Sequence, residues 1–345
     1  ANFLNVGTTM PVFTVNNAGA ALPGGTPTMD AAAIQSGNAF LSSELESVDP
    51  LLRKPLTSVT YPRDLPIEVG GGWVDYVSAM SVAYGMAGGS GASTVNGGGS
   101  NGIPVVQASV SKGAFKAHVF AAALRVMFVD MQRANFVGRS LDQMLQDGIR
   151  LAYDKHMDQN TYVGFDEYAT TGLVNNPDVT KTTAATSGTG SSSKFADKTP
   201  KQILADINSA ITAVWAANEY DEAGIPNHIL IPYEQYSYIT TTMVSDLGTE
   251  TIYDFLKKHN VAANHGVDLE IVPTRWVKGA GTSGGDRMVV YVNNRRFVKA
   301  DELVPLSRVM SAPNVTNVCY DTAYMANASE VQLMYQTSML YVDGI

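Results

Sequence analysis

Apolar and polar side chains alternate along the segment from 74 to 86. One parity holds bulky apolar residues and the other holds mainly small or polar ones, which is the pattern of a β-strand. The bulky set is Val74, Tyr76, Met80, Val82, Tyr84 and Met86, interrupted at Val77 and Ser78. A tip follows at 88–102, where ten of fifteen positions are Gly or Ser, and then a second β-rich segment, Ile103 to Ser111. Together they predict one long hairpin.

The length of this hairpin has a consequence for where it lies. Arms of about twenty residues extend about 60 Å, whereas a compact chain of this size has a radius of gyration of about 20 Å. A lone two-stranded ribbon is marginal in water, and this one has little charge. We therefore predict that it lies on a neighbouring copy, with Trp73, Tyr76 and Tyr84 in inter-subunit contacts. The alternative is that bulges fold the arms back into a sandwich.

Helical spacing replaces the alternation after Asp130. Ser140 and Gln143 form a capping box, and the helix they open runs to about Thr161, with Gly164 as its terminator. Its charged residues predict a solvated polar face. They are Asp142, Asp147, Arg150, Asp154, Lys155 and Asp158.

A mixed sheet with helices is predicted for the following region. Thr199, Pro200 and Gln202 open a helix with an apolar stripe. Further helices are expected in a Tyr-rich stretch and at 251–259, with strands at 229–231, 269–272 and 288–292. Strand patterning returns after Phe297, through 318–320 and 339–342.

Two further segments are low in charge. Residues 1–29 contain no charged side chain and are broken by Pro and Gly, so they predict an extended arm without strand pairing; a short helix is expected at 30–48. Residues 182–193 are only Thr, Ala, Ser and Gly, which predicts a flexible loop.

Composition changes the interpretation of these segments. Charged residues make up 16% of the 345, against about 25% in typical soluble domains, although apolar residues reach 45% and the net charge is −9. A β-rich extracellular protein is one explanation. However, Cys319 is the only thiol and is expected to be a buried hydrophobe, and the first basic residue is Arg53, so neither a disulfide framework nor a signal peptide is predicted. The uneven deficit indicates surfaces shared between copies.

Patterns typical of enzymes are weak. Gly97, Gly99 and Gly102 fit a dinucleotide motif, and Gly98, Ser100 and Gly102 fit a hydrolase motif, but both lie in a Gly tract before a strand rather than a helix. The histidines show no metal spacing and are expected at the surface or hydrogen-bonded: His118, His156, His228, His259 and His265. No cofactor, metal or membrane span is predicted, and an acidic chain would enclose DNA without adhering to it.

The order of these elements resembles that of the major capsid proteins of tailed double-stranded DNA bacteriophages and of the related encapsulin shells. Short motifs add to the resemblance. They are Glu44 to Pro50, Leu65-Pro66-Ile67, Ser140-Leu141-Asp142, Tyr162-Val163-Gly164, Gly172 to Pro177, which is similar to a GLLN turn, and Tyr341 to Ile345.

The resemblance implies an α+β fold of the tailed-phage major capsid type. Its parts would be an N-terminal arm at 1–60, an E-loop hairpin at 61–118, a peripheral domain with the spine helix at 119–165 and 298–332, and an axial domain at 166–297 and 333–345. Some relatives cross-link an E-loop lysine to a neighbour's asparagine. Because the segment from Asp64 to Ser111 holds no lysine, we predict a non-covalent shell.

The implied function is structural. Copies would form hexamers and pentamers that close into an icosahedral shell around double-stranded DNA, assembled in the bacterial cytoplasm and retained in the virion. Scaffolding, portal or decoration proteins are possible partners. The alternatives are an encapsulin-type nanocompartment, a β-rich virion adhesin or spike, and an enzyme; an enzyme would need a convergent acid, base and nucleophile that the sequence does not display.

Overall fold

The computed structural model describes residues 2–3, 13–14, 58–87, 105–137 and 141–345, in two units, Ala1–Ser58 and Val59–Ile345. In the first unit, β1 (Asn2–Phe3) pairs antiparallel with β2 (Phe13–Thr14). The prediction of an arm without strand pairing is therefore wrong at these four residues. Pro11 precedes β2, so it does not interrupt so short a ladder. The remaining arm and the helix expected at 30–48 lie outside the described residues.

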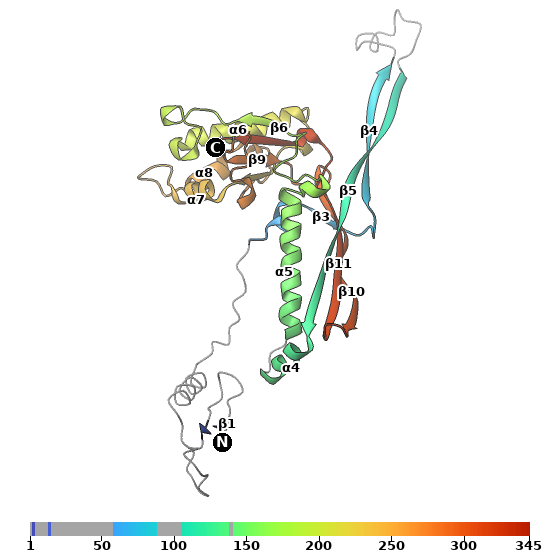
Figure 1. The fold of residues 1–345 in the computed structure, drawn as a ribbon. Coiled ribbons are helices and arrows are strands. Elements are labelled where there is room, and N and C mark those ends of the chain that lie inside the picture. The colour runs from blue at the N-terminus through green and yellow to red at the C-terminus, as the bar shows by residue number, and fades with distance from the viewer. Residues whose placement is uncertain (1, 4–12, 15–57, 88–104, 138–140) are drawn as a thin grey trace, which may run out of the picture. The chain divides into compact units, whose positions relative to one another are not determined.

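The described residues of the second unit form two sheets, and the first is built on one long strand. Its order is β12-β10-β11-β5-β4, with β3 parallel to β10. The strands are β3 (Ile67–Val69), β4 (Tyr76–Ala87), β5 (Val105–Met127), β10 (Val298–Asn314), β11 (Cys319–Ser329) and β12 (Gln332–Leu333). Cys319 is buried, as expected. Strand β5 pairs with β4 up to Lys116 and with β11 from Ala117 onward (Figure 1).

Helix α5 (Leu141–Tyr162) packs on this sheet and confirms the predicted long helix. Tyr153 and Met157 meet Ala326 and Ala328 of β11 in one cluster, and Ile149 meets β5 in another. Gly164 follows with a φ of 74°, the left-handed conformation of a helix end. A short helix that the sequence patterns did not predict, α4 (Phe128–Val137), links β5 to α5 (Figure 1).

The predicted polar face of α5 is wrong at Asp158. This carboxylate is buried and accepts hydrogen bonds from the Thr60 amide at 3.0 Å and from the Trp276 indole at 2.7 Å. The partners lie 98 and 118 residues away, so helical periodicity alone could not indicate them.

The second sheet has the order β6-β13-β9-β7-β8. Its strands are β6 (Thr180–Thr183), β7 (His228–Ile231), β8 (Glu270–Pro273), β9 (Arg287–Tyr291) and β13 (Met339–Asp343). Its helices are α6 (Pro200–Ala217), α7 (Tyr233–Thr241), α8 (Ile252–His259) and α9 (Val261–Asn264). The predicted strands and helices of this region are confirmed, including the Thr199–Gln202 capping box on α6.

Both faces of this second sheet are covered, because alternate residues of β7, β9 and β13 enter two different cores. Val290 and Leu340 join the apolar stripe of α6 on one face. Val289 and Tyr341 join Tyr162, from the end of α5, on the other face. The second core therefore connects the sheet to the end of α5.

The segment 182–193 is more regular than predicted. Its first residues complete β6, the buried Ala184 donates its amide to the carbonyl of Asp343 at 2.8 Å, and Thr189–Ser191 form a 3₁₀ turn. A Cβ at Gly188 would lie 2.8 Å from the carbonyl oxygen of Ser192. Small side chains thus permit close packing here, and the segment is not an irregular loop throughout, because it contains the end of β6 and a 3₁₀ turn.

Candidate functional site

The β4–β5 ribbon presents an uncovered apolar face. Cross-strand register places Met80 opposite Lys112, Val82 opposite Val110, and Tyr84 opposite Ala108, so these side chains share one face. Met80 and Tyr84 are 75% and 77% exposed.

The opposite face of the ribbon carries mainly small side chains, with Val77 and Phe115 as a bulky pair near its base. Ser81 and Ser111 form a hydrogen bond across it with an Oγ to Oγ distance of 2.5 Å. Among the described strands β4 pairs with β5 alone, so the ribbon does not fold back into the alternative sandwich. A contiguous exposed apolar face marks a surface for contact with another molecule.

All three residues predicted as inter-subunit contacts are exposed. Trp73 precedes β4, and Tyr76 and Tyr84 lie on the apolar face of the ribbon. Sequence analysis left Val110 out of the contact set, although it lies opposite Val82 in the register. The parity of the bulky residues on β4 was the signal that could have extended the set to Met80.

The base of the ribbon is fixed by backbone contacts. Gly70, Gly71 and Gly72 have φ values of 125°, 127° and 80°, which favour glycine, and a Cβ at Gly71 would lie 2.5 Å from Leu303. The amides of Gly70 and Gly72 donate to carbonyls of β10. Asn327 of β11 donates to the carbonyls of Gly72 and Val74 at 3.3 and 3.0 Å. These contacts set the point from which the ribbon leaves the sheet.

A buried polar network holds the segment that leads into the ribbon. Asp64, at the end of α2 (Tyr61–Asp64), lies 3.0 Å from Nε2 of His228 and accepts two hydrogen bonds from Arg63, at 2.7 and 3.0 Å. The hydroxyl of Tyr162 donates to the same carboxylate, and that of Tyr291 donates to the Asp64 carbonyl.

Burial alone would raise the pKa of Asp64, but the hydrogen bonds from His228, Arg63 and Tyr162 outweigh it and lower the pKa. The carboxylate is fully buried and both of its oxygens are engaged. The network is closed to a substrate, so its chemistry suits holding the chain rather than catalysis. No sequence signal marked it, because His228 lies 164 residues away.

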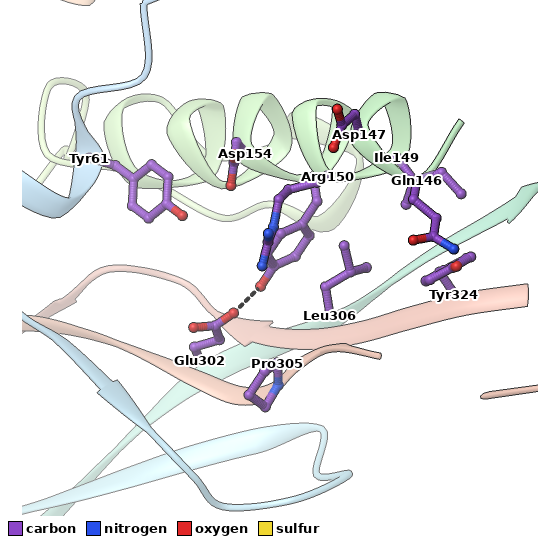
Figure 2. Close-up of a pocket in the computed structure, with 11 residues that line it drawn as sticks. Tyr61, Gln146, Asp147, Ile149, Arg150, Asp154, Glu302, Pro305, Leu306 and Tyr324 are labelled. Atoms are coloured by element: carbon purple, nitrogen blue, oxygen red, sulfur yellow. Dashed lines mark hydrogen bonds between the residues drawn. The ribbon is translucent and has the colours of Figure 1, made fainter. Parts of the chain in front are cut away.

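A cavity of about 430 Å³ lies between α5 and β10. Figure 2 shows Tyr61 and Asp154 on one side and Glu302 on the other. The hydroxyl of Tyr153, which also lines the cavity, donates a hydrogen bond to Glu302 at 2.7 Å. Burial, followed by the charge of Asp154, raises the pKa of Tyr61 to about 12, and burial raises that of Asp154. Burial and the charge of Asp154 thus favour the protonated form of Tyr61, and burial favours the protonated form of Asp154. These groups do not form a nucleophile with an activating base.

The remaining chemical candidates separate into two groups. Gly97 to Gly102, including Ser100, lie outside the described residues. Among the described residues, no three His, Cys, Asp or Glu side chains are arranged to hold a metal ion.

The histidines were predicted to lie at the surface or to be hydrogen-bonded. His259 and His265 are exposed, as predicted. The prediction is wrong for His118, because its ring is buried and neither nitrogen has a hydrogen-bond partner. Within the part of the chain that the structure describes, no helix is both long and apolar enough to cross a membrane.

Comparison with solved structures defines the class of fold. The capsid of Myoviridae phage XM1 is similar with a TM-score of 0.71 and 15% identity, over 88% of this chain and 98% of that chain. The structure of Microbacterium phage Oxtober96 is similar with a TM-score of 0.56 and 14% identity, over 89% and 98%. The capsid of the native GTA particle gives 0.58 and 10%, over 86% and 94%. The fold is therefore that of tailed-phage capsid subunits.

The family follows from the sequence itself. The model of the major capsid protein family matches residues 91–345. This chain belongs to the major capsid protein family, and the resemblance seen in its motifs is confirmed. A comparison with curated proteins found no match. Family and fold together give the chain a structural role in an icosahedral shell, and they favour neither an encapsulin-type compartment nor an adhesin.

Proposed function

We propose that this shell protein forms hexamers and pentamers in which the β4–β5 ribbon of each copy lies on its neighbour, and that the closed shell encloses double-stranded DNA in the virion. The observation that carries the proposal is the apolar face of the ribbon. Met80 and Tyr84 remain largely exposed on a single chain. Covering such a face contributes about 25 cal/mol for each Å² of apolar area removed from water.

The same proposal assigns each segment of the chain to a part of the capsid subunit. Residues 61–118 act as the E-loop, 119–165 with 298–332 as the peripheral domain, 166–297 with 333–345 as the axial domain, and 1–60 as the arm. The change of partner by β5 after Lys116 supports a boundary close to residue 118. Trp73, Tyr76 and Tyr84 contact the neighbouring copy.

Packaged DNA is proposed to be held without sequence specificity. The chain carries a net charge of −9, which supports an enclosure with weak adhesion rather than a nucleic-acid groove. We place assembly in the bacterial cytoplasm, with scaffolding, portal or decoration proteins as further partners. The role is structural and involves no catalysis.

The direct test uses two sources of particles. One is a bacterial host that expresses the full chain alone, and the other is host cells infected with the complete phage. Electron microscopy should show closed shells with five-fold and six-fold capsomers, and particles from infected cells should contain nuclease-protected double-stranded DNA. Trimers without closed shells would contradict the assembly proposal. Shells from infected cells that contain an enzyme cargo and no DNA would contradict the proposed content.

A further inference from the structure

A buried histidine, His118, and a half-buried one, His156, meet where β5 changes its pairing partner. His118 lies opposite Ala328 of β11, two residues beyond Lys116, the last residue of β5 that pairs with β4. His156 lies on α5. The two ring centroids are 5.3 Å apart and the rings are inclined at 65°. The pair therefore connects the base of the ribbon to the spine helix.

Aromatic rings extend this contact to a third element, the 3₁₀ turn η1 (Asp166–Tyr168). His118 stacks on Tyr168, with centroids 5.4 Å apart and planes at 10°. His156 stacks on Phe165, which precedes η1, with centroids 4.6 Å apart, and contacts Phe120 of β5 at 4.9 Å. The two imidazole rings thus join β5, α5 and the segment around η1 in one cluster.

The imidazoles are suited to this position only in their neutral form. Both ring nitrogens of His118 and Nε2 of His156 are buried without hydrogen-bond partners. Protonation would leave His118 with a charge and two buried N–H donors that have no acceptor among the described residues, and it would add a charge to His156, whose buried Nε2 also lacks a partner. Burial lowers the pKa of His118, and burial together with repulsion from His118 lowers that of His156 to about 4.

The surrounding charges do not reverse this preference. The ammonium of Lys116 lies on the same side and donates to the carbonyls of Tyr168 and Ala169 at 3.0 and 3.4 Å. Glu330 accepts from the Lys116 amide at 2.8 Å. Other titratable groups of the packed elements include Tyr153, Asp154, Lys155 and Asp158 on α5, Asp321 and Tyr324 on β11, and the exposed Asp166, Glu167 and Tyr168 on η1. None of the hydrogen bonds in the described residues joins a carboxylate to a ring nitrogen of His118.

We infer that the His118–His156 cluster is an acid-sensitive joint, which holds the ribbon base against α5 and η1 while both imidazoles are neutral and opens when they take up protons. In the open state the imidazoles titrate near their ordinary pKa of 6.5. As the pH falls below that value the open state gains protons first, so the equilibrium constant for opening rises by about tenfold per pH unit for each histidine. The rise continues until the closed state also takes up protons, near pH 4 for His156.

The opening is expected to be local. The Asp64 network has a carboxylate with a lowered pKa, so it keeps its charge and its hydrogen bonds at pH 5. Strand β5 also keeps its ladders to β4 and β11 on either side of the joint. Release of the contacts at His118 and His156 therefore frees the turn and the helix end from the ribbon base without unfolding either sheet.

Hydrogen–deuterium exchange of the full chain, corrected for the intrinsic effect of pH on exchange, tests this inference. Between pH 7.5 and 5.0, the peptide covering 165–170 should gain at least about tenfold in exchange rate, whereas peptides covering 114–121, 287–291 and 339–343, whose amides stay in strand ladders, should not. A double variant, His118→Phe with His156→Phe, should lose the gain. The matched control is His259→Phe, an exposed histidine in contact with Phe255, and it should keep the gain. Unchanged exchange in the wild type, or a full gain in the double variant, would overturn the joint.

A second measurement covers the case in which the double variant does not fold. Deuterium exchange at the imidazole C2 position reports the titration midpoint of each histidine in the unmodified protein. His118 and His156 should both titrate below pH 6.5, with His156 the lower. A midpoint at or above 6.5 for either residue rules out the joint. This measurement does not depend on shell formation.

Discussion

Nε2 of His228 lies 3.0 Å from a carboxylate oxygen of Asp64, and both side chains are buried although 164 residues separate them in the chain. The pair joins the segment entering the ribbon to a central strand of the second sheet. Because Asp64 has a lowered pKa, its charge stabilises the folded chain fully above its ordinary pKa of 3.8, and this contribution is lost as the pH falls through the lower folded-state value.

Replacing Asp64 by Asn should therefore destabilise the fold. The substitution keeps the size of the side chain but removes the charge that Arg63, Tyr162 and His228 stabilise, and the free energy of unfolding should fall by about 3 kcal/mol at pH 7. Urea unfolding of the full chain measures it. The difference from wild type should shrink at pH values below 3.8. Asp178→Asn, at an exposed carboxylate, is the control and should stay within about 0.5 kcal/mol; equal effects of the two substitutions would contradict the role of Asp64.

Two glycines should respond in opposite directions to alanine. A Cβ at Gly172 would lie 2.3 Å from the carbonyl carbon of Tyr162, so Gly172→Ala should lower the free energy of unfolding by about 1–3 kcal/mol. A Cβ at Gly148, inside α5, meets nothing within 4 Å, and alanine there should raise it by up to about 1 kcal/mol. Denaturant midpoints of the two variants decide the signs. If Gly172→Ala left the free energy of unfolding unchanged, that result would contradict the close contact between Gly172 and the backbone of Tyr162.

The ribbon proposal predicts variants that assemble poorly but fold normally. Met80→Ser and Tyr84→Ser change side chains that face solvent within one chain, so the free energy of unfolding should not change. If a neighbour covers them, each substitution should raise the protein concentration needed for shell formation by at least about tenfold. Sedimentation separates shells from free subunits. The matched control is Tyr220→Ser, at an exposed tyrosine outside the ribbon, and it should assemble like the wild type. Normal assembly of both ribbon variants would refute the proposed contact.

Mature particles should dissociate fully in denaturing electrophoresis. Asp64 to Ser111 hold no lysine, although Lys112 lies on the exposed apolar face of the ribbon, opposite Met80. We expect this protein from boiled particles to migrate at the mass of one chain, without bands at multiples of that mass. A covalent ladder would contradict the prediction. If the ladder disappeared in Lys112→Arg, the bond would come from the ribbon itself.

Local signals predicted the helices and the ribbon well. The box at Thr199 and Gln202 marked the start of α6, and its apolar stripe became the core of the second sheet. The parity around Tyr76 to Tyr84 predicted a strand whose bulky face is open. These features depend on neighbours within a few residues, which sequence periodicity records.

Features that depend on distant partners were missed. Asp158 looked like part of a solvated face until Trp276 supplied a buried donor. His118 sits in a strand with no metal or catalytic spacing, and its significance arises only when α5 brings His156 beside it. The continuation of β5 to Met127 also needed β11 as a partner, because the run after Lys116 pairs with a strand about two hundred residues later in the chain.

The unbroken course of β5 has a mechanical consequence. Its 23 residues are shared between two antiparallel ladders, one with β4 and one with β11. A pull on the ribbon along the strand direction acts on both ladders in shear, so many hydrogen bonds resist together instead of opening one after another as in peeling. Tension applied to the ribbon by a neighbouring copy would thus be transmitted along β5 to the sheet that packs against α5. In a stretched shell, β5 would therefore carry mechanical load from one subunit to the next.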